Sequence, residues 1–226
     1  MAILPLESSK PDSSLSKQVI LVYGQAKIGK STLCSKFEKP LFLATEPGLN
    51  NLDVFRVNVT NWEKFLTACS EIAEGKHGFK TIVIDTVDNL VIFCQDYICK
   101  KEGVSHPADL PHGKGWHMVT SELHRALAKL AILPYGLILV SHCELLEVET
   151  KTKKYNRFTI SIGGKNRQVV LNMVDLILFI DSVSDSNGEK RIIRTKPSLY
   201  WEAGDRANRL PEIVPLDYDA LAKYFK

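Results

Sequence analysis

The segment from Gly24 to Ser31 matches the pattern G-x-x-x-x-G-K-S, a glycine-rich loop that ends in an amine and a hydroxyl. Glycine permits backbone angles closed to other residues, so successive N–H groups of such a loop can wrap a phosphate. The Lys30 ammonium would reach the β- and γ-phosphates, and the Ser31 hydroxyl would bind Mg²⁺. The pattern predicts a nucleotide-phosphate site made of Gly24, Gln25, Ala26, Lys27, Ile28, Gly29, Lys30, Ser31 and Thr32.

Two acidic residues follow apolar segments and are candidates for the chemistry beside this loop. Asp85 comes after four β-branched residues, and a carboxylate at the end of such a strand can hold the water shell of Mg²⁺. Glu46 precedes Pro47-Gly48, and from that turn its carboxylate can polarise a water in line with the γ-phosphate. The alternative for both residues is an ordinary acidic side chain in a turn.

A parallel sheet must position these residues, because ligands bind at the carboxyl ends of its strands. Short apolar runs predict strands at 18–23, 40–45, 54–59, 81–85, 137–141, 174–181 and 190–195. Apolar residues at helical spacing predict helices at 30–37, 61–74, 87–100 and 116–133. Alternating strands and helices, with several strands apolar throughout, indicate a three-layer α/β fold around a mainly parallel central sheet.

The composition limits the classes of protein that fit. The chain has 226 residues, 45% of them hydrophobic, which suits one domain at 18–226 behind a flexible polar arm at 1–17. A net charge of +3 is too small to indicate nucleic-acid binding by itself. The five cysteines show no metal-binding spacing and are expected to be reduced thiols. Without a signal peptide or a bilayer-spanning segment, we expect a cytoplasmic protein with no membrane partner.

Together these motifs resemble the RecA-like ATPases. The phosphate loop, Glu46 after the second strand, Asp85 after a later strand, and Ser141-His142 closing a fourth follow the order of that family. The stretch 158–167, with its double glycine before a predicted strand, is similar to the second DNA loop of RecA. Still more similar are the small phage-encoded RecA-core ATP-binding proteins linked to single-strand annealing, in segments 82–86, 194–198 and 202–206. The resemblance covers residues 18–226.

This resemblance implies a three-layer RecA-like P-loop NTPase with ATP and Mg²⁺ as cofactors. Lys30 and Ser31 would bind phosphate and metal, Asp85 would bind the metal, and Glu46 would activate the water. The implied partners are single-stranded DNA, further copies of the chain in a ring or filament, and a single-strand-binding protein. The implied location is the cytoplasm, that of a bacterial host if the protein is phage-encoded.

The resemblance also gives roles to three further residues. His142 takes the place of a glutamine that in RecA senses the γ-phosphate and moves the DNA loop, so this chain departs from the family pattern there. The alternative is a histidine satisfied at a strand end. Arg194 and Lys196 would reach the γ-phosphate of a neighbouring protomer and stabilise charge in the transition state. The alternative is a solvated basic strand end.

The segment from Lys151 to Gln168 is basic, contains no acidic residue and includes aromatic side chains. Cationic groups that follow a backbone, with aromatic faces for unstacked bases, suit single-stranded nucleic acid. The alternative is a solvated loop, and the position after His142 favours DNA by resemblance. The predicted DNA-binding residues are Lys151, Lys153, Lys154, Tyr155, Arg157, Lys165 and Arg167.

The connection 103–117 contains three histidines, His106, His112 and His117. Their spacing matches no common zinc site, so we expect a mobile loop, with a first DNA loop as the alternative.

Three functions stay open at this point. The first is a DNA-stimulated ATPase that promotes annealing or strand pairing, the second a P-loop kinase of a small molecule, and the third a nucleotide-dependent adaptor such as a helicase loader. Glu46 argues against the kinase, which does not need to activate water there. Phosphate release with and without single-stranded DNA separates the three.

Overall fold

The structure, a computed structural model, describes residues 14–186 and 188–225. Every strand that the apolar runs predict is present, as β1 (Val19–Gly24), β2 (Pro40–Ala44), β3 (Phe55–Asn58), β4 (Thr81–Asp85), β5 (Gly136–Glu149), β7 (Leu176–Asp185) and β8 (Gly188–Arg194). The four predicted helices appear as α1 (Lys30–Cys34), α2 (Trp62–Glu74), α3 (Val87–Glu102) and α4 (Lys114–Ala131). Elements beyond the prediction are β6 (Lys154–Ile160), α5 (Gly164–Met173), β9 (Gly204–Asp205), β10 (Ile213–Pro215) and α6 (Tyr218–Ala222).

The strands form one sheet in the order β10-β8-β7-β1-β5-β4-β2-β3. Neighbours from β7 to β3 are parallel, whereas β8 and β10 are antiparallel to their neighbours. The prediction of a mainly parallel central sheet is therefore confirmed. Strand β5 lies between β1, which leads into the phosphate loop, and β4, which ends in Asp85.

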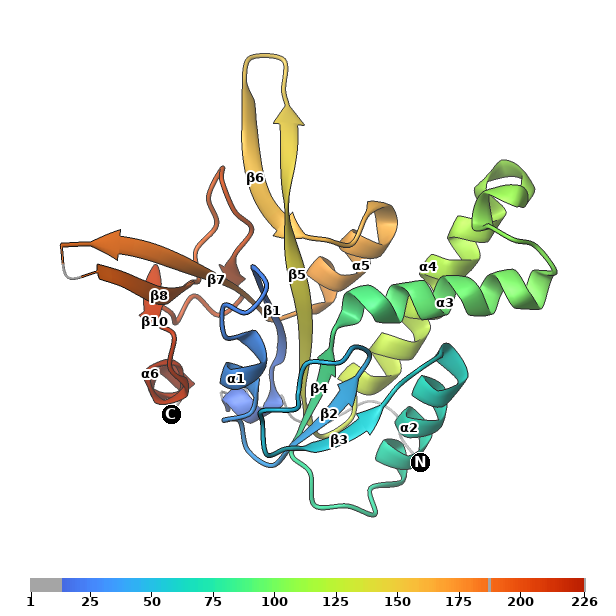
Figure 1. Ribbon diagram of the computed structural model, residues 1–226, viewed down its shortest axis with the longest axis horizontal. Helices are drawn as coiled ribbons and strands as arrows, with labels where there is room; N and C mark the ends of the chain where they lie inside the picture. The colour runs from blue at the N-terminus through green and yellow to red at the C-terminus, as the bar shows by residue number, and fades with distance from the viewer. Residues whose placement is uncertain (1–13, 187, 226) are drawn as a thin grey trace, which may run out of the picture.

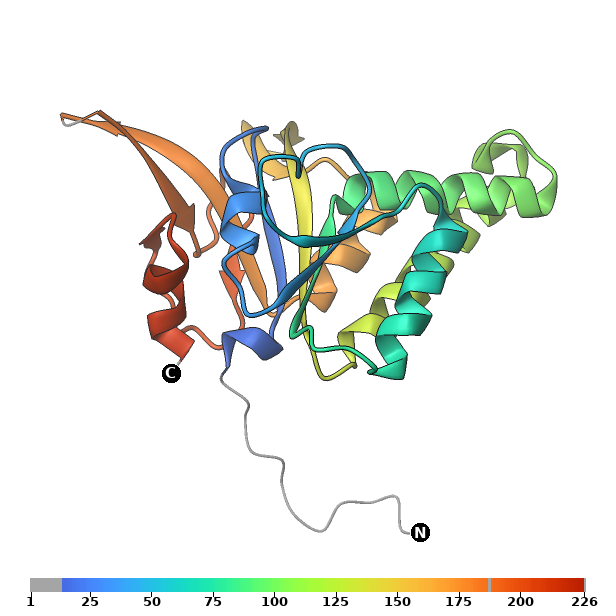
Figure 2. The ribbon, with the colours of Figure 1, turned by 60° about the horizontal axis from the view of Figure 1, so that its bottom comes forward.

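Alternate side chains along the strands pack into two cores, one on each face of the sheet. Leu21 and Leu139 face the core that α2, α3, α4 and α5 cover, while Val22 and Val140 face the core that α1 and α6 cover. Figures 1 and 2 show these helices around the sheet. A sheet buried on both faces explains why its strands are apolar throughout.

Two antiparallel hairpins, β5–β6 and β7–β8, project from the body of the protein (Figure 1). The first corrects the expectation of a polar loop as far as Gln168, because β5 continues to Glu149 and pairs with β6 from Cys143–Ile160 to Glu149–Lys154. The double-glycine stretch then leads into α5 and not directly into a strand. Pairing with β6 across the turn at 150–153 overrides the weak strand preference of the glutamates in β5.

The N-terminal end of the described chain is folded. Leu15–Lys17 forms a short 3₁₀ helix, and Leu15 is only 5% exposed in the core beside β1. The folded part therefore begins before residue 18. Residues 1–13 of the predicted arm lie outside the described residues.

The connection between α3 and α4 contains two short 3₁₀ helices, Pro107–Asp109 and Pro111–Gly113. A Cβ at Gly115 would lie 2.2 Å from the carbonyl oxygen of Pro107, so glycine lets this connection pack directly on the first turn of α4. The expected loop is thus anchored at one point. Its neighbour in sequence, Trp116, is held at the helix surface and is 39% exposed.

All five cysteines are free thiols. Among the helices that the structure describes, none combines the length and the apolar character needed to cross a bilayer.

Candidate active site

The phosphate loop leaves β1 at Gly24 and enters α1 at Lys30. A Cβ at Gly24 would lie 2.6 Å from the carbonyl oxygen of Ile180 in β7, so only glycine fits there. Gly29 has a φ of 116°, in the left-handed region that glycine favours. One glycine of the pattern is therefore required by close packing and the other by backbone angle.

The side chains of Lys30 and Ser31 both point back to the mouth of the sheet. Lys30 Nζ donates to the carbonyl oxygens of Gly24 and Gln25, each at 2.9 Å, and burial lowers the pKa of this amine. Ser31 Oγ donates to Asp85 Oδ2 at 2.6 Å. Burial raises the pKa of Asp85, and the hydrogen bond from Ser31 opposes this. The two residues predicted to bind the metal are thus in direct contact.

This pair of oxygen donors suits magnesium. Mg²⁺ prefers oxygen ligands, keeps several waters, and is held by one or two protein groups together with phosphate oxygens. Within the described part of the chain, no group of three or more His, Cys, Asp or Glu side chains could hold a metal alone. Beside Asp85, the buried hydroxyl of Thr86 has no partner among the described residues. Ser31 and Asp85 therefore fit a cation that arrives with a nucleotide.

Glu46 lies just beyond β2 and contacts two polar side chains. Its Oε1 lies 3.2 Å from His142 Nε2, and its Oε2 accepts a hydrogen bond from Asn89 Nδ2 at 3.2 Å. The Glu46 side chain is 30% exposed, so water reaches the carboxylate. The motifs do not predict Asn89, whose only signal in the sequence is its place four residues after Asp85, in the first turn of α3.

The register of the sheet explains why these residues meet. Gly24 of β1 pairs with His142 of β5, and Ala44 of β2 pairs with Asp85 of β4. The carboxyl ends of the parallel strands therefore share one edge, where ligands bind in open α/β sheets. Glu46 follows Ala44 by two residues and so reaches the same edge.

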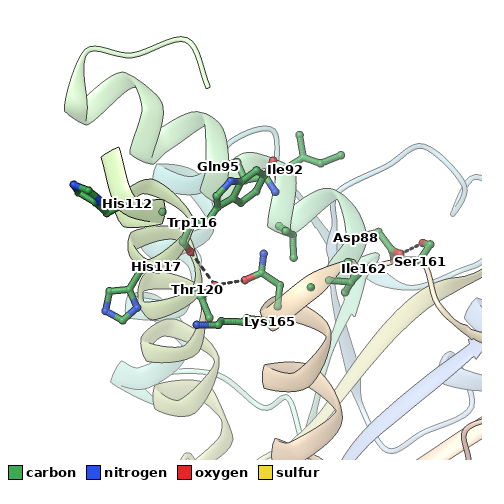
Figure 3. Close-up of a pocket in the computed structure, with 15 residues that line it drawn as sticks. Asp88, Ile92, Gln95, His112, Trp116, His117, Thr120, Ser161, Ile162 and Lys165 are labelled. Atoms are coloured by element: carbon green, nitrogen blue, oxygen red, sulfur yellow. Dashed lines mark hydrogen bonds between the residues drawn. The ribbon is translucent and has the colours of Figure 1, made fainter. Parts of the chain in front are cut away.

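Asp88, a second residue that the motifs miss, joins the middle of β5 to the loop after β6. Its carboxylate accepts hydrogen bonds from Ser141 Oγ at 2.9 Å and from the backbone N–H of His142 at 3.2 Å. It also accepts one from Ser161 Oγ, which Figure 3 shows as a dashed line. Contacts therefore run from Glu46 through His142 and Asp88 to Ser161, which precedes the double glycine.

Comparison with known proteins places this site in a family. A family model described as an AAA domain matches residues 16–207. The chain belongs to the AAA-domain family. A curated relative, the SPbeta prophage-derived uncharacterized protein YorG of Bacillus subtilis (strain 168), is 24% identical over 193 residues. The match covers 82% of this chain and 57% of YorG, so the chain spans little more than half the length of that relative.

Solved structures extend the comparison to the fold of this AAA-domain protein. The chain is similar to the KaiC-like protein PH0186 from Pyrococcus horikoshii OT3, with a TM-score of 0.51 and 14% identity over 88% of this chain and 85% of that one. The flagellar accessory protein FlaH from Methanocaldococcus jannaschii gives a TM-score of 0.47 and 8% identity over 88% and 84%. The first likeness confirms the predicted RecA-like P-loop fold, and at this identity it shows the fold alone.

Arg194 of this AAA-domain chain is engaged within its own protomer. Its Nε lies 2.6 Å from Asp181 Oδ2, and its guanidinium lies 4.1 Å from the centre of the Trp201 ring. The side chain of Lys196 donates to Asn208. The Arg194 side chain is only 15% exposed and its hydrogen bond to Asp181 is partly buried, whereas the hydrogen bond from Lys196 to Asn208 is exposed to solvent.

A cation that the motifs do not predict lies beside the phosphate loop. Arg191 of β8 lines a cavity of about 310 Å³ next to the predicted nucleotide-binding residues Gly29 and Thr32. Leu216 and Tyr218 from the C-terminal segment close the same cavity. Sequence patterns miss this arrangement because the segment lies almost two hundred residues from the loop.

The predicted DNA-binding residues fall on the β5–β6 hairpin and on α5. Lys151 and Lys153 lie at the hairpin turn, Lys154, Tyr155 and Arg157 lie on β6, and Lys165 and Arg167 lie on α5. The Arg157 guanidinium lies 5.6 Å from the centre of the Tyr155 ring.

Acidic side chains of β5 accompany several of these cations. Lys154 Nζ lies 3.6 Å from Glu147 and 3.3 Å from Glu149, and Arg167 pairs with Glu144. These partners come from outside the segment 151–168, whose composition alone suggested a purely basic surface. Lys151 and Lys153 at the turn have no acidic partner among the described ion pairs.

Proposed function

We propose that this protein is an ATPase that hydrolyses ATP with Glu46 as the general base and acts on single-stranded DNA. The observation that carries the proposal is the position of Glu46. Its solvent-accessible carboxylate lies at the same sheet edge as the phosphate loop and the Ser31–Asp85 pair, oriented by His142 and Asn89. An oriented carboxylate beside a phosphate site suits the activation of water.

Each residue has a defined task in this proposal. Lys30 exchanges its bonds to the loop carbonyls for bonds to the β- and γ-phosphates, while the backbone N–H groups of the loop hold the β-phosphate. Ser31 and Asp85 would hold Mg²⁺, which would supply positive charge to the phosphate oxygens. Glu46 takes a proton from water as the water oxygen attacks the γ-phosphorus. The bond between the γ-phosphorus and the β–γ bridging oxygen breaks, and ADP and inorganic phosphate are released.

The nucleoside part of ATP would occupy the cavity beside Arg191. That cavity adjoins Thr32, and Tyr218 and Leu216 offer it one aromatic and one aliphatic surface. Small-molecule sites commonly combine such surfaces with a few polar groups. The arrangement supports a nucleotide that extends from the phosphate loop toward the C-terminal segment.

Single-stranded DNA is proposed as the second partner because cations and an aromatic ring lie on the projecting hairpin. Lys151 and Lys153 are exposed at its turn, and Tyr155 follows on β6. Such a surface binds the phosphate backbone electrostatically and offers a face for stacking. We also propose that several copies of the chain assemble. In such an assembly, Arg194 and Lys196 would reach the γ-phosphate bound by a neighbouring copy.

Phosphate release from ATP, measured with and without single-stranded DNA, tests this function. We expect hydrolysis that DNA stimulates and that Lys30→Ala abolishes, with Lys64→Ala on the exposed face of α2 as a matched control. Transfer of phosphate to a small molecule would instead support a kinase. Tight binding of ATP without any turnover would support an adaptor and would refute the proposed hydrolysis.

A further inference from the structure

A cavity of about 880 Å³ lies outside the phosphate loop, between α3, α4 and the loop that joins β6 to α5 (Figure 3). Its volume falls within the roughly 300–1,000 Å³ of typical ligand sites. It brings together two segments that are far apart in sequence, the α3–α4 connection and the double glycine. The proposed hydrolysis of ATP uses neither segment directly.

One end of the cavity is aromatic and apolar. Trp116 is 39% exposed and Ile92 is 49% exposed, although both are large hydrophobic side chains. The His106 ring meets the Trp116 ring edge to face, with 5.3 Å between their centres, and Gly115 fixes the backbone beside it against Pro107. Trp116 is therefore a positioned flat surface that the described residues leave open to solvent.

Amide groups supply hydrogen bonds near this surface. The Thr120 hydroxyl lies 2.9 Å from both Asn166 Oδ1 and the Trp116 carbonyl oxygen and can donate its single proton to either. The Asn166 amide nitrogen has no hydrogen-bond partner among the described residues. Gln95 lines the cavity as well, and Figure 3 shows it near Trp116. Amides offer both donors and acceptors, as the edge of a nucleobase requires.

Nothing in the described part of the structure requires glycine at position 163. Its φ of −85° suits any residue, and a Cβ built there would meet no atom within 4 Å. Gly163 nevertheless lines the cavity, where the absence of a side chain lets a ligand approach the protein backbone closely. The first turn of α5 begins at this point with free backbone N–H groups and Lys165, which suit a phosphate.

We infer that this cavity binds one unstacked nucleobase of a single strand, which stacks on Trp116 while its backbone passes Gly163. The inference deepens the proposed action on single-stranded DNA and rests on it. The base would lie at the opposite end of the cavity from Ser161 and Asp88 (Figure 3). Because Asp88 also holds the backbone of His142, occupancy of the cavity would bias the position of Glu46.

The test compares an oligothymidylate with an abasic oligomer of equal length, each with a non-hydrolysable ATP analogue in the phosphate loop. We expect Trp116→Ala to lower the affinity for the oligothymidylate by about 5- to 150-fold, which corresponds to the loss of one base–aromatic stack. The affinity for the abasic oligomer should be unaffected. Trp116→Phe, which keeps a flat ring, should retain most of the affinity. Tryptophan emission of the wild type should change on binding, and this change should be absent in Trp116→Phe.

A second pair of variants guards against loss of folding. Gly163→Ala adds a methyl group that fits the free protein but narrows the cavity. This variant should therefore also lower the affinity for the oligothymidylate more than the affinity for the abasic oligomer. Gly78→Ala is the matched control, because a Cβ there likewise meets no atom within 4 Å and Gly78 does not line the cavity. Melting temperatures confirm that both variants are folded.

Equal affinity of the wild type for the two oligomers would overturn the base site while leaving the proposed action on DNA intact. Selective binding that Trp116→Ala and Gly163→Ala do not alter would also overturn it, because the base would then lie elsewhere. If the wild type binds neither oligomer, both the inference and the proposed action on DNA fail.

Discussion

The Nε2 atom of His142 lies 3.2 Å from the Glu46 carboxylate across 96 residues of sequence. The backbone N–H of the same histidine donates to Asp88 at 3.2 Å. His142 therefore contacts the candidate general base through its ring. Through its backbone it contacts Asp88, which in turn accepts a hydrogen bond from Ser161. A shift at the middle of β5 changes both contacts together.

Glu46→Gln should separate binding from chemistry. The amide keeps the size of the side chain and the contact with His142, but it cannot accept a proton from water. We expect ATP affinity to remain and turnover to fall by about 10²–10⁴-fold, the usual contribution of a general base. Binding by fluorescent ATP analogue and phosphate release are the two measurements. Turnover equal to that of the wild type would remove Glu46 from this role.

Asp85→Asn should stabilise the protein without nucleotide at neutral pH and abolish magnesium-dependent binding of ATP. Burial raises the pKa of Asp85, so the folded state holds this proton more tightly than the unfolded state. The associated stability is complete below the unfolded pKa and is lost as pH rises through the folded pKa. The advantage of the variant in melting temperature should therefore shrink as the pH falls through the raised folded pKa, and it should be lost below the unfolded pKa of about 4.

A constant difference in melting temperature between pH 3 and pH 7 would contradict this linkage. Asp96→Asn, on the partly exposed face of α3, is the control and should leave both melting and nucleotide binding unchanged.

The shared site between protomers is best tested through Lys196. Arg194→Ala removes the partner of Asp181 and should cost about 1.5–3 kcal/mol of stability, the range for hydrogen bonds to charged groups. Lys196→Ala should leave melting unchanged. If Lys196 acts in trans, mixing inactive Lys196→Ala with inactive Lys30→Ala protein should recover part of the ATPase activity. Absence of recovery at every mixing ratio would contradict a shared site.

The hairpin cations give a salt-dependence prediction. Lys151→Glu with Lys153→Glu should weaken binding of single-stranded DNA and reduce the slope of log affinity against log salt by about 0.7 per lost phosphate contact. Lys154→Gln is the matched control, because Glu147 and Glu149 already accompany its ammonium, and it should change the slope less. An unchanged slope in the Glu variant would exclude the hairpin turn from the DNA path.

Local sequence was sufficient for the parallel strands of the sheet and for the phosphate loop. β-branched runs such as Thr81–Asp85 are strands because both of their faces are buried, and that condition is visible as an uninterrupted apolar run. The spacing of Gly24, Gly29 and Lys30 predicts a phosphate-binding loop from local sequence alone, without knowledge of tertiary contacts.

The parts that sequence analysis missed depend on contacts between distant segments. The outer half of β5 is an exception, because it mixes glutamate with aliphatic residues without strict alternation and pairs with β6 across the turn at 150–153. Asn89 and Asp88 are unremarkable helical residues until the register of β4 and β5 sets them beside Glu46 and His142. Composition of 151–168 likewise could not show the carboxylates that β5 sets against its cations.

Strand β5 pairs with different neighbours along its length. Its inner part, Gly136–His142, is parallel to β1 and β4, and its outer part, Cys143–Glu149, is antiparallel to β6. His142 is the last residue of the inner part, and the strand continues outward without a break (Figure 1). The hairpin therefore continues directly from the residue that contacts the candidate general base. Because no turn interrupts β5 between the hairpin and His142, we expect a displacement of the hairpin tip to be transmitted along the strand to that histidine.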